Sequence, residues 1–498
     1  MKKIVLFIMI ILLFGLAGCK KNNTYNDGIA YNEGLVLKSE NKLYYSDLKS
    51  KMRLIDSNDA NPSGFKFINN HLFYNTTEGF IYHIDLKSKD NQAQRLMPTT
   101  YRYFLDNTGT LVTYLNENTI YQIDLKKSTD PYVIATNITN NDTYFVSSDG
   151  KKFIYSWASN VYTVDRSKDN SSPQLVLESV SEIYPTNDLS YVLLLANNGD
   201  LYSYKFGKEA EFIDSGVIRV IIHNEPEKNF LYAVKEETSQ TNYYLKAYKN
   251  GKIIVITDHY RLDAYNGIKC YYEYNDGLYY FDGSKSHLIS KSIESVTKAA
   301  WKNTLSITYK NTDGTYYLAI NKKTYYLSNN STVGTLYSDN NRYLFLFMSK
   351  DNGKMVIEKI DLKSLLKLPK YYKTNTSYTC VGDVFIRGKD IFYIDTLSRY
   401  LYINNKYVGE TNSWDIKECN NKYYYLYNKH LYCISNYKVK DIQDSINEFI
   451  VVGNKVVVFK NTSDVVKGVC VLKGTSLKTI GENIDNHYLI QDYKHFYW

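Results

Sequence analysis

A repeat of about forty residues, marked by a recurring tyrosine, is the feature that most restricts the fold of this chain. Its clearest copies read LYYSDLKS from Leu43, IYHIDLKS from Ile81 and IYQIDLKK from Ile120. VYTVD from Val161 and LYSYK from Leu201 continue the series, and the tyrosine position advances by 38, 39, 41 and 40 residues. Such a constant spacing indicates one supersecondary unit that is stacked many times.

Weaker copies extend the repeat along the rest of the chain. They carry the register to Lys246, Tyr279, Leu318, Glu358, Tyr402, Tyr432 and Cys470. From Tyr44 to Cys470 this makes twelve positions, and 426 residues over 11 intervals correspond to about 39 residues for each unit. That length is just below the ~40 to 45 residues of one four-stranded propeller blade.

The pattern within a unit predicts β-strands. Tyr82, Ile84 and Leu86 alternate with His83 and Asp85, which is the period of two that a strand imposes. The aspartate that ends each clear copy is expected to close the next turn, with a carboxylate oxygen accepting a local backbone N–H. The same four aspartates could in principle ring a channel and bind a cation, and the turn role is the preferred interpretation. They are Asp47, Asp85, Asp124 and Asp165.

Turn signals stand between the apolar runs. Asn275-Asp276-Gly277 and Asp313-Gly314 each separate two such runs, and Asp-Gly accommodates the positive φ angles of tight hairpins. Only residues 292–302 suggest a short helix. The chain is therefore predicted to be all-β.

Radial repetition removes exposed sheet edges, so we expect tandem β-propellers. Twelve units exceed the commonest single rings, which favours two six-bladed rings, the first over residues 26–261 and the second over residues 262–498. A single ring of seven or eight larger blades is the alternative, and a solenoid is less favoured.

The first nineteen residues predict export and lipidation. Lys2 and Lys3 precede an apolar run from Ile4 to Leu16, which is short for a membrane-spanning helix. The following Leu-Ala-Gly-Cys resembles the lipobox of bacterial lipoproteins. This resemblance implies cleavage of the signal peptide (residues 1–18), a diacylglyceryl group and further acylation such as palmitate at Cys19, and a lipid-anchored tether over residues 19–25 facing outside the cytoplasm.

Composition excludes some partners and leaves the cysteines in a packing role. The net charge of +8 falls to +6 when Lys2 and Lys3 are removed with the signal peptide, and basic and acidic residues are interspersed, which argues against nucleic-acid binding. The membrane, through the lipid, is the expected partner. Five further cysteines at irregular spacing are interpreted mainly as small apolar strand residues: Cys270, Cys380, Cys419, Cys433 and Cys470.

The repeat also resembles known propeller classes. The hairpin from Leu72 to Asp85 is similar to the bacterial relatives of the Tyr-Trp-Thr-Asp propellers of the low-density-lipoprotein receptor, although the tryptophan of that motif is missing. The segment from Ser148 to Tyr155, with Asp-Gly-Lys, resembles the blade hairpin of TolB-like propellers. Both resemblances imply a β-propeller body and leave its function open, because such propellers serve as binding platforms, carbohydrate enzymes and peptidase accessory domains.

No linear motif for catalysis, phosphate binding or metal binding stands in the sequence, so no catalytic residue, metal ligand or cofactor is predicted. His83 is interpreted as structural, and Arg261 and Trp414 as either ligand contacts or packing residues. We therefore expect a membrane-tethered lipoprotein that binds a protein or carbohydrate partner. An extracytoplasmic hydrolase or lyase acting on glycans or peptides is an alternative, and a sugar-binding lipoprotein is another.

Overall fold

The computed structural model describes residues 31–492 except for gaps at 41, 50, 57–61, 89–91, 99–102, 140–141, 168–171, 222–228, 236–242, 259–260, 302–303, 329–331, 338–342, 350–354, 362–375, 381–382, 388–389, 396–397, 412–414 and 462–466. All regular elements in this part of the chain are β-strands, numbered β1 to β48. Cys19 and the predicted signal peptide and tether lie outside the described residues. Within the described part, no helix is long and apolar enough to cross a membrane.

The described strands form ten four-stranded antiparallel sheets and one eight-stranded sheet, which divides at its parallel strand pair into two antiparallel groups of four. We call each group of four strands a blade. Within each blade the strands run in chain order from the first to the fourth, except that blade 1 takes its first strand from the C-terminus. Blades 1 to 6 consist of β48 (Asn486–Asp492), β1 (Tyr31–Ser39), β2 (Lys42–Ser46) and β3 (Arg53–Asp56); β4 (Pro62–Ile68), β5 (His71–Thr76), β6 (Phe80–Asp85) and β7 (Gln94–Pro98); β8 (Tyr103–Leu105), β9 (Leu111–Asn116), β10 (Thr119–Asp124) and β11 (Tyr132–Ala135); β12 (Tyr144–Val146), β13 (Lys152–Trp157), β14 (Asn160–Asp165) and β15 (Gln174–Leu177); β16 (Val180–Pro185), β17 (Val192–Ala196), β18 (Leu201–Tyr204) and β19 (Glu211–Asp214); and β20 (Val217–Ile221), β21 (Asn229–Lys235), β22 (Tyr243–Lys249) and β23 (Lys252–Asp258).

The remaining blades have the same strand order. Blades 7 to 12 consist of β24 (Arg261–Asn266), β25 (Lys269–Tyr274), β26 (Gly277–Phe281) and β27 (Ser286–Ser290); β28 (Ile293–Trp301), β29 (Thr304–Asn311), β30 (Tyr316–Ile320) and β31 (Lys323–Ser328); β32 (Thr332–Tyr337), β33 (Tyr343–Ser349), β34 (Met355–Asp361) and β35 (Thr376–Cys380); β36 (Asp383–Arg387), β37 (Asp390–Ile394), β38 (Tyr400–Ile403) and β39 (Lys406–Glu410); β40 (Lys417–Cys419), β41 (Lys422–Tyr427), β42 (His430–Ser435) and β43 (Lys438–Gln443); and β44 (Ile446–Val452), β45 (Lys455–Asn461), β46 (Lys467–Lys473) and β47 (Ser476–Ile484).

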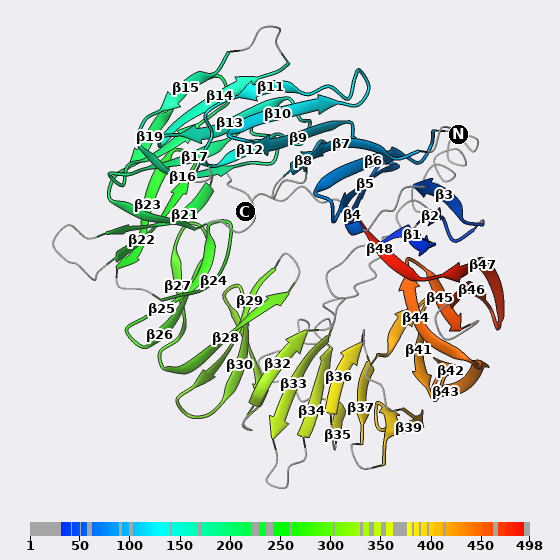
Figure 1. Cartoon of the computed structure of the whole chain (residues 1–498). Coiled ribbons are helices and arrows are strands. Elements are labelled where there is room, and N and C mark those ends of the chain that lie inside the picture. Colours follow the sequence, from blue (N-terminus) through cyan, green and yellow to red (C-terminus); the bar gives the residue numbers. More distant parts are fainter. Residues whose placement is uncertain are drawn as a thin grey trace, which may run out of the picture.

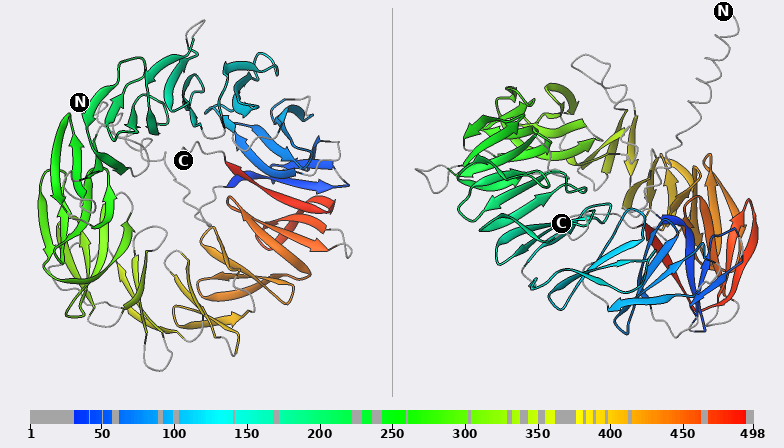
Figure 2. Two further views of the ribbon diagram at one scale, coloured as in Figure 1. Left: turned by 60° about the vertical axis from the view of Figure 1, so that its left-hand side comes forward. Right: turned by 90° about the horizontal axis from the view of Figure 1, so that it is seen from above.

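The blades follow one another around a ring, with the first strand of each blade innermost, as in a β-propeller (Figures 1 and 2). Apolar clusters join neighbouring blades: one cluster holds Phe73 of blade 2 with Val112 of blade 3, and another holds Phe392 of blade 10 with Tyr425 of blade 11. Because each blade buries its two faces against its neighbours, the hydrophobic core is a series of layers between blades.

The structure bears on the border between the two six-bladed rings expected from the sequence. The expected border after Arg261 falls at the start of blade 7, but blade 6 packs directly on blade 7 through a cluster that contains Leu231 and Cys270. The C-terminal strand β48 pairs with β1, so the last strand of the chain lies beside its first (Figure 1). A repeat count alone carries no information on which blades become neighbours, so the division into residues 26–261 and 262–498 stays a prediction from the sequence.

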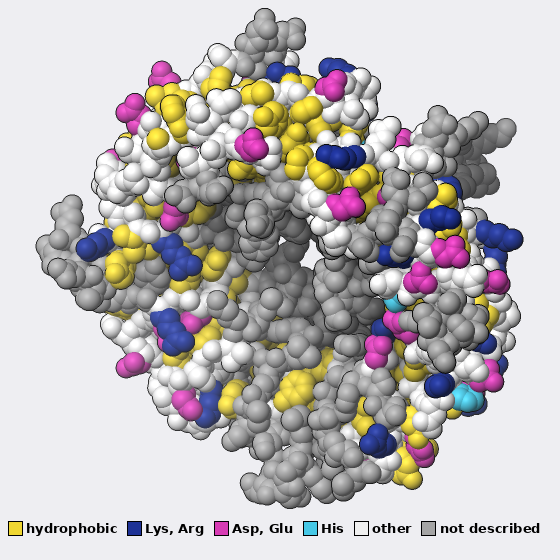
Figure 3. Space-filling view, viewed as in Figure 1, with side chains coloured by type: hydrophobic (Ala, Val, Ile, Leu, Met, Phe, Trp, Pro, Cys, Tyr) yellow, Lys and Arg dark blue, Asp and Glu magenta, His cyan; other side chains and the backbone are white. Residues whose placement is uncertain are grey.

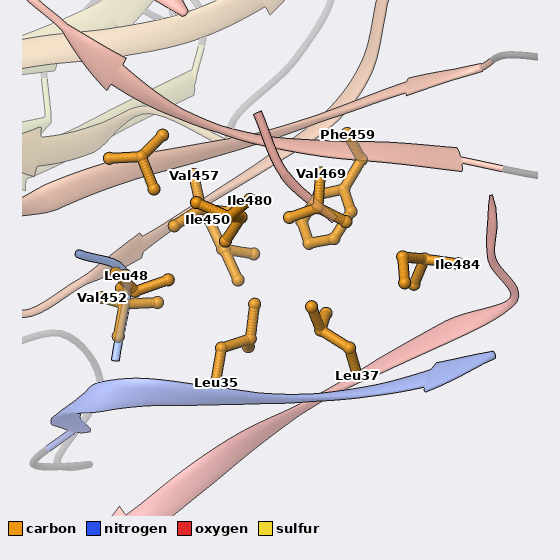
Figure 4. Packing of buried hydrophobic residues seen from close by; sticks show 11 residues of the cluster. Leu35, Leu37, Leu48, Ile450, Val452, Val457, Phe459, Val469, Ile480 and Ile484 are labelled. Atoms are coloured by element: carbon orange, nitrogen blue, oxygen red, sulfur yellow. The ribbon is translucent and has the colours of Figure 1, made fainter. Parts of the chain in front are cut away.

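Blade 12 and blade 1 meet around a fully apolar cluster (Figure 4). Leu35 and Leu37 of β1 point toward Val457 and Phe459 of β45, and all four side chains are 0% exposed. β48 also pairs in parallel with β4, where Lys66 lies opposite Gln491. The C-terminal strand thus joins blade 1 to blade 2 by backbone pairing and completes the face that packs against blade 12.

Several local predictions from the sequence are confirmed. The backbone N–H groups of Lys49 and Lys87 donate to the carboxylates of Asp47 and Asp85, at 2.9 and 2.8 Å, and Asp124 and Asp165 accept from the residues two positions later in the same way. The described cysteine side chains are buried thiols in strands: Cys270, Cys419, Cys433 and Cys470. Cys380 ends β35, and its side chain is outside the described set.

The short helix expected over residues 292–302 is wrong. This segment is β28, which pairs with β29 along its length, with Val296 opposite Tyr309. Ile293, Val296 and Thr297 are β-branched and lose side-chain freedom in a helix, whereas a neighbouring strand provides partners for their side chains.

Candidate binding surface

The repeat tyrosines lie on the third strand of their blades, and in seven blades the tyrosine of the third strand stacks on a tyrosine of the second strand. In blade 2, Tyr82 is directly opposite Tyr74 and the two rings are stacked at 5.5 Å between centroids. The closest such pair is Tyr393–Tyr402 at 4.6 Å, and the others are Tyr114–Tyr121, Tyr155–Tyr162, Tyr272–Tyr279, Tyr309–Tyr317 and Tyr425–Tyr432. An aromatic pair contributes about 0.5 to 1.5 kcal/mol beyond its buried area.

These stacked pairs face the preceding blade. Tyr74 and Tyr82 of blade 2 pack in the cluster that also contains Val36 and Ile55 of blade 1, and Tyr272 and Tyr279 of blade 7 pack against blade 6. In blade 8 the repeat spacing pointed to Leu318, but the residue that stacks on the second strand is its neighbour Tyr317. The abundance of tyrosine is thus largely explained by packing between blades.

The fourth strand extends this face of the blade to the outer rim of the ring. Immediately after a bulge, the residue opposite the repeat tyrosine is Val133 on β11 and Leu175 on β15. Directly paired residues of an antiparallel sheet share a face, so both side chains continue the tyrosine row toward solvent.

Five consecutive blades expose a large apolar side chain at this rim position. The exposed fractions are 52% for Val133, 51% for Leu175, 59% for Phe212, 58% for Val255 and 47% for Leu288. We call this set, on blades 3 to 7, the apolar arc. Figure 3 shows hydrophobic side chains gathered along the upper rim, over the region of β10, β11 and β14.

In three other blades the same position is polar. Arg95 lies opposite Tyr82 in blade 2, Asp441 opposite Tyr432 in blade 11, and Thr479 opposite Cys470 in blade 12. Leu54 in blade 1 and Tyr407 in blade 10 are exposed at this position as well, so among the described blades the apolar side chains form one unbroken run over blades 3 to 7 and recur in blades 1 and 10. Register shifts disturb regular pairing between the third and fourth strands, a feature that discourages addition of a further strand at the blade edge.

Neighbouring blades are also joined by tyrosine-to-aspartate hydrogen bonds. The hydroxyl of Tyr74 in blade 2 donates to the buried carboxylate of Asp56 at the end of blade 1. Between blades 5 and 6, Tyr232 donates to Asp214 at 2.9 Å, and the ammonium of Lys246 lies 2.9 Å from the same carboxylate oxygen. Burial and the neighbouring carboxylate hold the pKa of both tyrosines well above the usual range.

The most strongly perturbed histidines are paired within blade 2. Nδ1 of His71 and Nε2 of His83 share a hydrogen bond of 2.9 Å, and the ring of His83 lies against Phe73. Burial lowers the pKa of His83 to about 4, with His71 adding to the effect, and burial also lowers the pKa of His71 against the opposing influence of Asp85 and Asp106. Both rings are therefore neutral near pH 7, as suits structural histidines.

Other polar groups are dispersed. Asp282 accepts hydrogen bonds from Ser284 and from His287, which hold the pKa of its carboxyl well below the usual range. Arg261 is exposed at the start of blade 7, 3.7 Å from Glu273. Among the described side chains, no group of three or more His, Cys, Asp and Glu residues is placed to hold a metal ion.

The sequence-predicted site residues have different outcomes. Cys19 and Trp414 lie outside the described residues. The channel-ring alternative for the repeated aspartates is not what the structure shows, because their carboxylates accept backbone hydrogen bonds in turns. The apolar arc was missed, because its residues follow the repeat position at distances that vary from 9 to 13 residues and only the strand register places them at one position.

Comparisons with known proteins find similarity only among solved structures. No protein family model matches the chain, and no curated protein matches it. Alignment with TolB from Acinetobacter baumannii has 15% identity and a TM-score of 0.23, covering 44% of this chain and 62% of that one. The WD40 domain of Sif2 aligns at 12% identity over 75% of this chain and 95% of that one, with a TM-score of 0.28, and PorZ of Porphyromonas gingivalis at 10% over 94% and 88%, with a TM-score of 0.23. The assignment as a propeller rests on the strand order and not on these alignments.

Proposed function

We propose that this chain is a membrane-tethered, extracytoplasmic lipoprotein whose propeller body binds a partner through the apolar arc. The observation that carries the proposal is the exposure of Val133, Leu175, Phe212, Val255 and Leu288 at one repeated position of five consecutive blades. Large apolar side chains gathered on a solvent-facing surface mark interaction sites, whereas isolated ones need no explanation. In blades 3, 4 and 7 the residue beside the arc side chain is a tyrosine that is stacked on a second tyrosine, which provides a rigid base.

The arc fits a protein partner better than a small ligand. Its residues lie on separate blades along a convex rim, whereas small-molecule sites are concave and enclose their ligand. Phe212, the most exposed of the set, contacts Tyr202 edge to face and has a geometry suited to an anchor residue.

Substitution of the arc tests the binding role. We expect Phe212→Ser to weaken partner binding by roughly 10- to 100-fold, since a central aromatic anchor commonly contributes at least 2 kcal/mol. The partner is first captured from envelope extract by cross-linking at the rim and then titrated as a purified protein. Thr479→Ser, at the matching position of blade 12, is the control. Equal affinity for the two variants would contradict the proposal.

The tether has a separate test. Cys19→Ser removes the thiol that the lipid requires, so we expect loss of acyl labelling and release of the protein from membranes. Persistence of both labelling and membrane retention in this variant would refute lipid anchoring at Cys19.

A further inference from the structure

The strand order gives the ring two distinct faces. Turns that join first to second and third to fourth strands lie together on one face: the N–H of Leu86 donates to the carbonyl of Asn70 at 2.9 Å, and that of Arg166 to the carbonyl of Lys151 at 2.8 Å. The other turns lie together on the opposite face, where the N–H of Ile446 donates to the carbonyl of Lys429 at 2.8 Å.

The chain enters the ring on the first of these faces. β1 begins at Tyr31, which lies opposite Gln491, and Gln491 also lies opposite Lys66 near the end of β4. β4 ends at Ile68 and turns into β5, so Tyr31 stands at the level of a first-to-second turn. The segment that leads to Cys19 therefore leaves from the face that holds the third-to-fourth turns.

This face is basic, and we call it the lysine face. Every third-to-fourth turn in the described part of the chain has an exposed lysine or arginine within it or at the adjoining strand end. Examples from six blades are Lys87, Lys126, Arg166, Lys208, Lys322 and Lys473.

Carboxylates offset only part of this charge. The exposed acidic residues in the described turns of the lysine face, or at the adjoining strand ends, are Asp130, Asp149, Asp188, Glu209 and Glu211. The repeated aspartates are half-buried and accept backbone N–H groups of their own turns, as Asp85 does from Lys87 at 2.8 Å. The side chains that extend furthest into solvent there are consequently mainly cationic.

The opposite face has the reverse character, and we call it the acidic face. Its described turns expose Glu40, Glu78, Glu117, Asp276, Asp313 and Asp444. Lys291, Arg399 and Lys429 are exposed cations on the same face. The charges that are interspersed along the sequence are thus sorted by the fold, because the repeat returns each turn to the same side of the ring.

We infer that the lysine face lies against an anionic phospholipid surface and orients the ring parallel to the membrane. The inference rests on the proposed function, because the lipid on Cys19 would place this face, and not the acidic face, next to the bilayer. The eleven residues between Cys19 and Tyr31 span at most about 40 Å, which confines the ring to the neighbourhood of the bilayer. Attraction between exposed charges extends over about 10 Å, so a lysine face in contact is held and an acidic face is repelled.

The experiment measures binding of the soluble protein to vesicles. The mature chain from residue 19 with Cys19→Ser is mixed with phosphatidylcholine vesicles or with vesicles of equal parts phosphatidylcholine and phosphatidylglycerol, and bound protein is measured by sedimentation at rising NaCl concentration. Each lysine near an anionic surface contributes roughly a fivefold gain in binding. We therefore expect Lys208→Glu, Lys322→Glu and Lys473→Glu together to lower binding to the anionic vesicles by about 100-fold or more.

A triple variant of the acidic face is the matched control. Lys291→Glu, Arg399→Glu and Lys429→Glu change the net charge by the same amount, and we expect less than a threefold effect on vesicle binding. Equal loss in both triple variants, or equal binding to neutral and anionic vesicles, would overturn the inference. Competition by inorganic phosphate at constant ionic strength would also overturn it, since that would indicate a discrete phosphate site and not a lipid surface.

This test is independent of the tether. The vesicle assay uses a protein without an acyl chain, so its failure leaves lipid anchoring untouched. Conversely, absence of acyl labelling on the unaltered chain would contradict lipid anchoring at Cys19. In that case we still expect the lysine face to bind anionic vesicles.

Discussion

Replacement of His83 by glutamine should remove much of the acid sensitivity of blade 2. The buried imidazole has a pKa of about 4 in the folded protein against 6.5 as a free side chain, so the unfolded chain binds a proton first as the pH falls. The neutral ring of His83 makes its full contribution to the free energy of unfolding above about pH 6.5. This contribution is lost as the pH falls from about 6.5 to 4, and it changes little below pH 4. The pKa of His83 thus differs by about 2.5 between the folded and the unfolded chain. At about 1.36 kcal/mol for each pKa unit, this difference corresponds to about 3 kcal/mol in the free energy of unfolding.

Glutamine is a suitable replacement because Gln122 occupies the equivalent position of blade 3. There its side-chain amide donates to Thr113 at 3.1 Å and to the carbonyl of Gly150 at 2.7 Å. We expect His83→Gln to leave the fold intact and to make the loss of stability between pH 7 and pH 4 smaller by about 3 kcal/mol.

The assay is denaturant unfolding at several pH values, combined with hydrogen exchange of β5 and β6. Carboxylates elsewhere in the chain titrate in the same range, but they are common to both proteins and cancel in the difference between them. His71 stays in the variant, and its own lowered pKa gives a smaller effect of the same sign. Identical pH dependence of unfolding in the two proteins would refute the reasoning.

Two further predictions concern contacts between blades. Tyr74→Phe removes one hydrogen bond to the carboxylate of Asp56 and should lower the free energy of unfolding by about 2 kcal/mol, whereas Tyr232→Phe should have a smaller effect because the carboxylate of Asp214 is more exposed to water than that of Asp56; equal losses in urea unfolding would contradict this difference. Phe459→Ala should lower the free energy of unfolding by about 3 to 5 kcal/mol, because it leaves a cavity between blade 12 and blade 1. Hydrogen exchange in β48 should then accelerate at lower denaturant concentration than exchange in blades 4 and 5. Uniform acceleration around the ring would argue against a local opening between blades 12 and 1.

The local structure was predictable because it depends on short-range rules. The alternation around Tyr82 indicated a strand, and the aspartate after it indicated a turn, both of which depend on a few neighbouring residues. The arrangement of the blades was not predictable from the sequence. Nothing in the sequence near Arg261 indicates whether blade 6 packs on blade 7 or on blade 1. Pairing of β1 with β48 has no local signal either, since its two partners are separated by almost the whole chain.

The apolar arc could not be predicted from the sequence for a similar reason. An isolated valine such as Val133 is unremarkable in sequence, and its exposure follows from its place on a fourth strand after a bulge. The tyrosine excess, by contrast, was visible at once, but its assignment to stacking between neighbouring strands needed the register of each blade. Composition predicted strand content, and only the fold separated packing residues from surface residues.

Pairing of the last strand with the first has a consequence for the order of assembly. Blade 1 contains the first strands to be synthesised, yet it lacks its inner strand until Asn486 to Asp492 have been added to the chain. The apolar side chains of Leu35 and Leu37 therefore lack their packing partners in blade 12 until the other eleven blades have been synthesised. A chain that ends before β48 lacks the inner strand of its first blade, so completion of blade 1 depends on synthesis of the twelve blades in full.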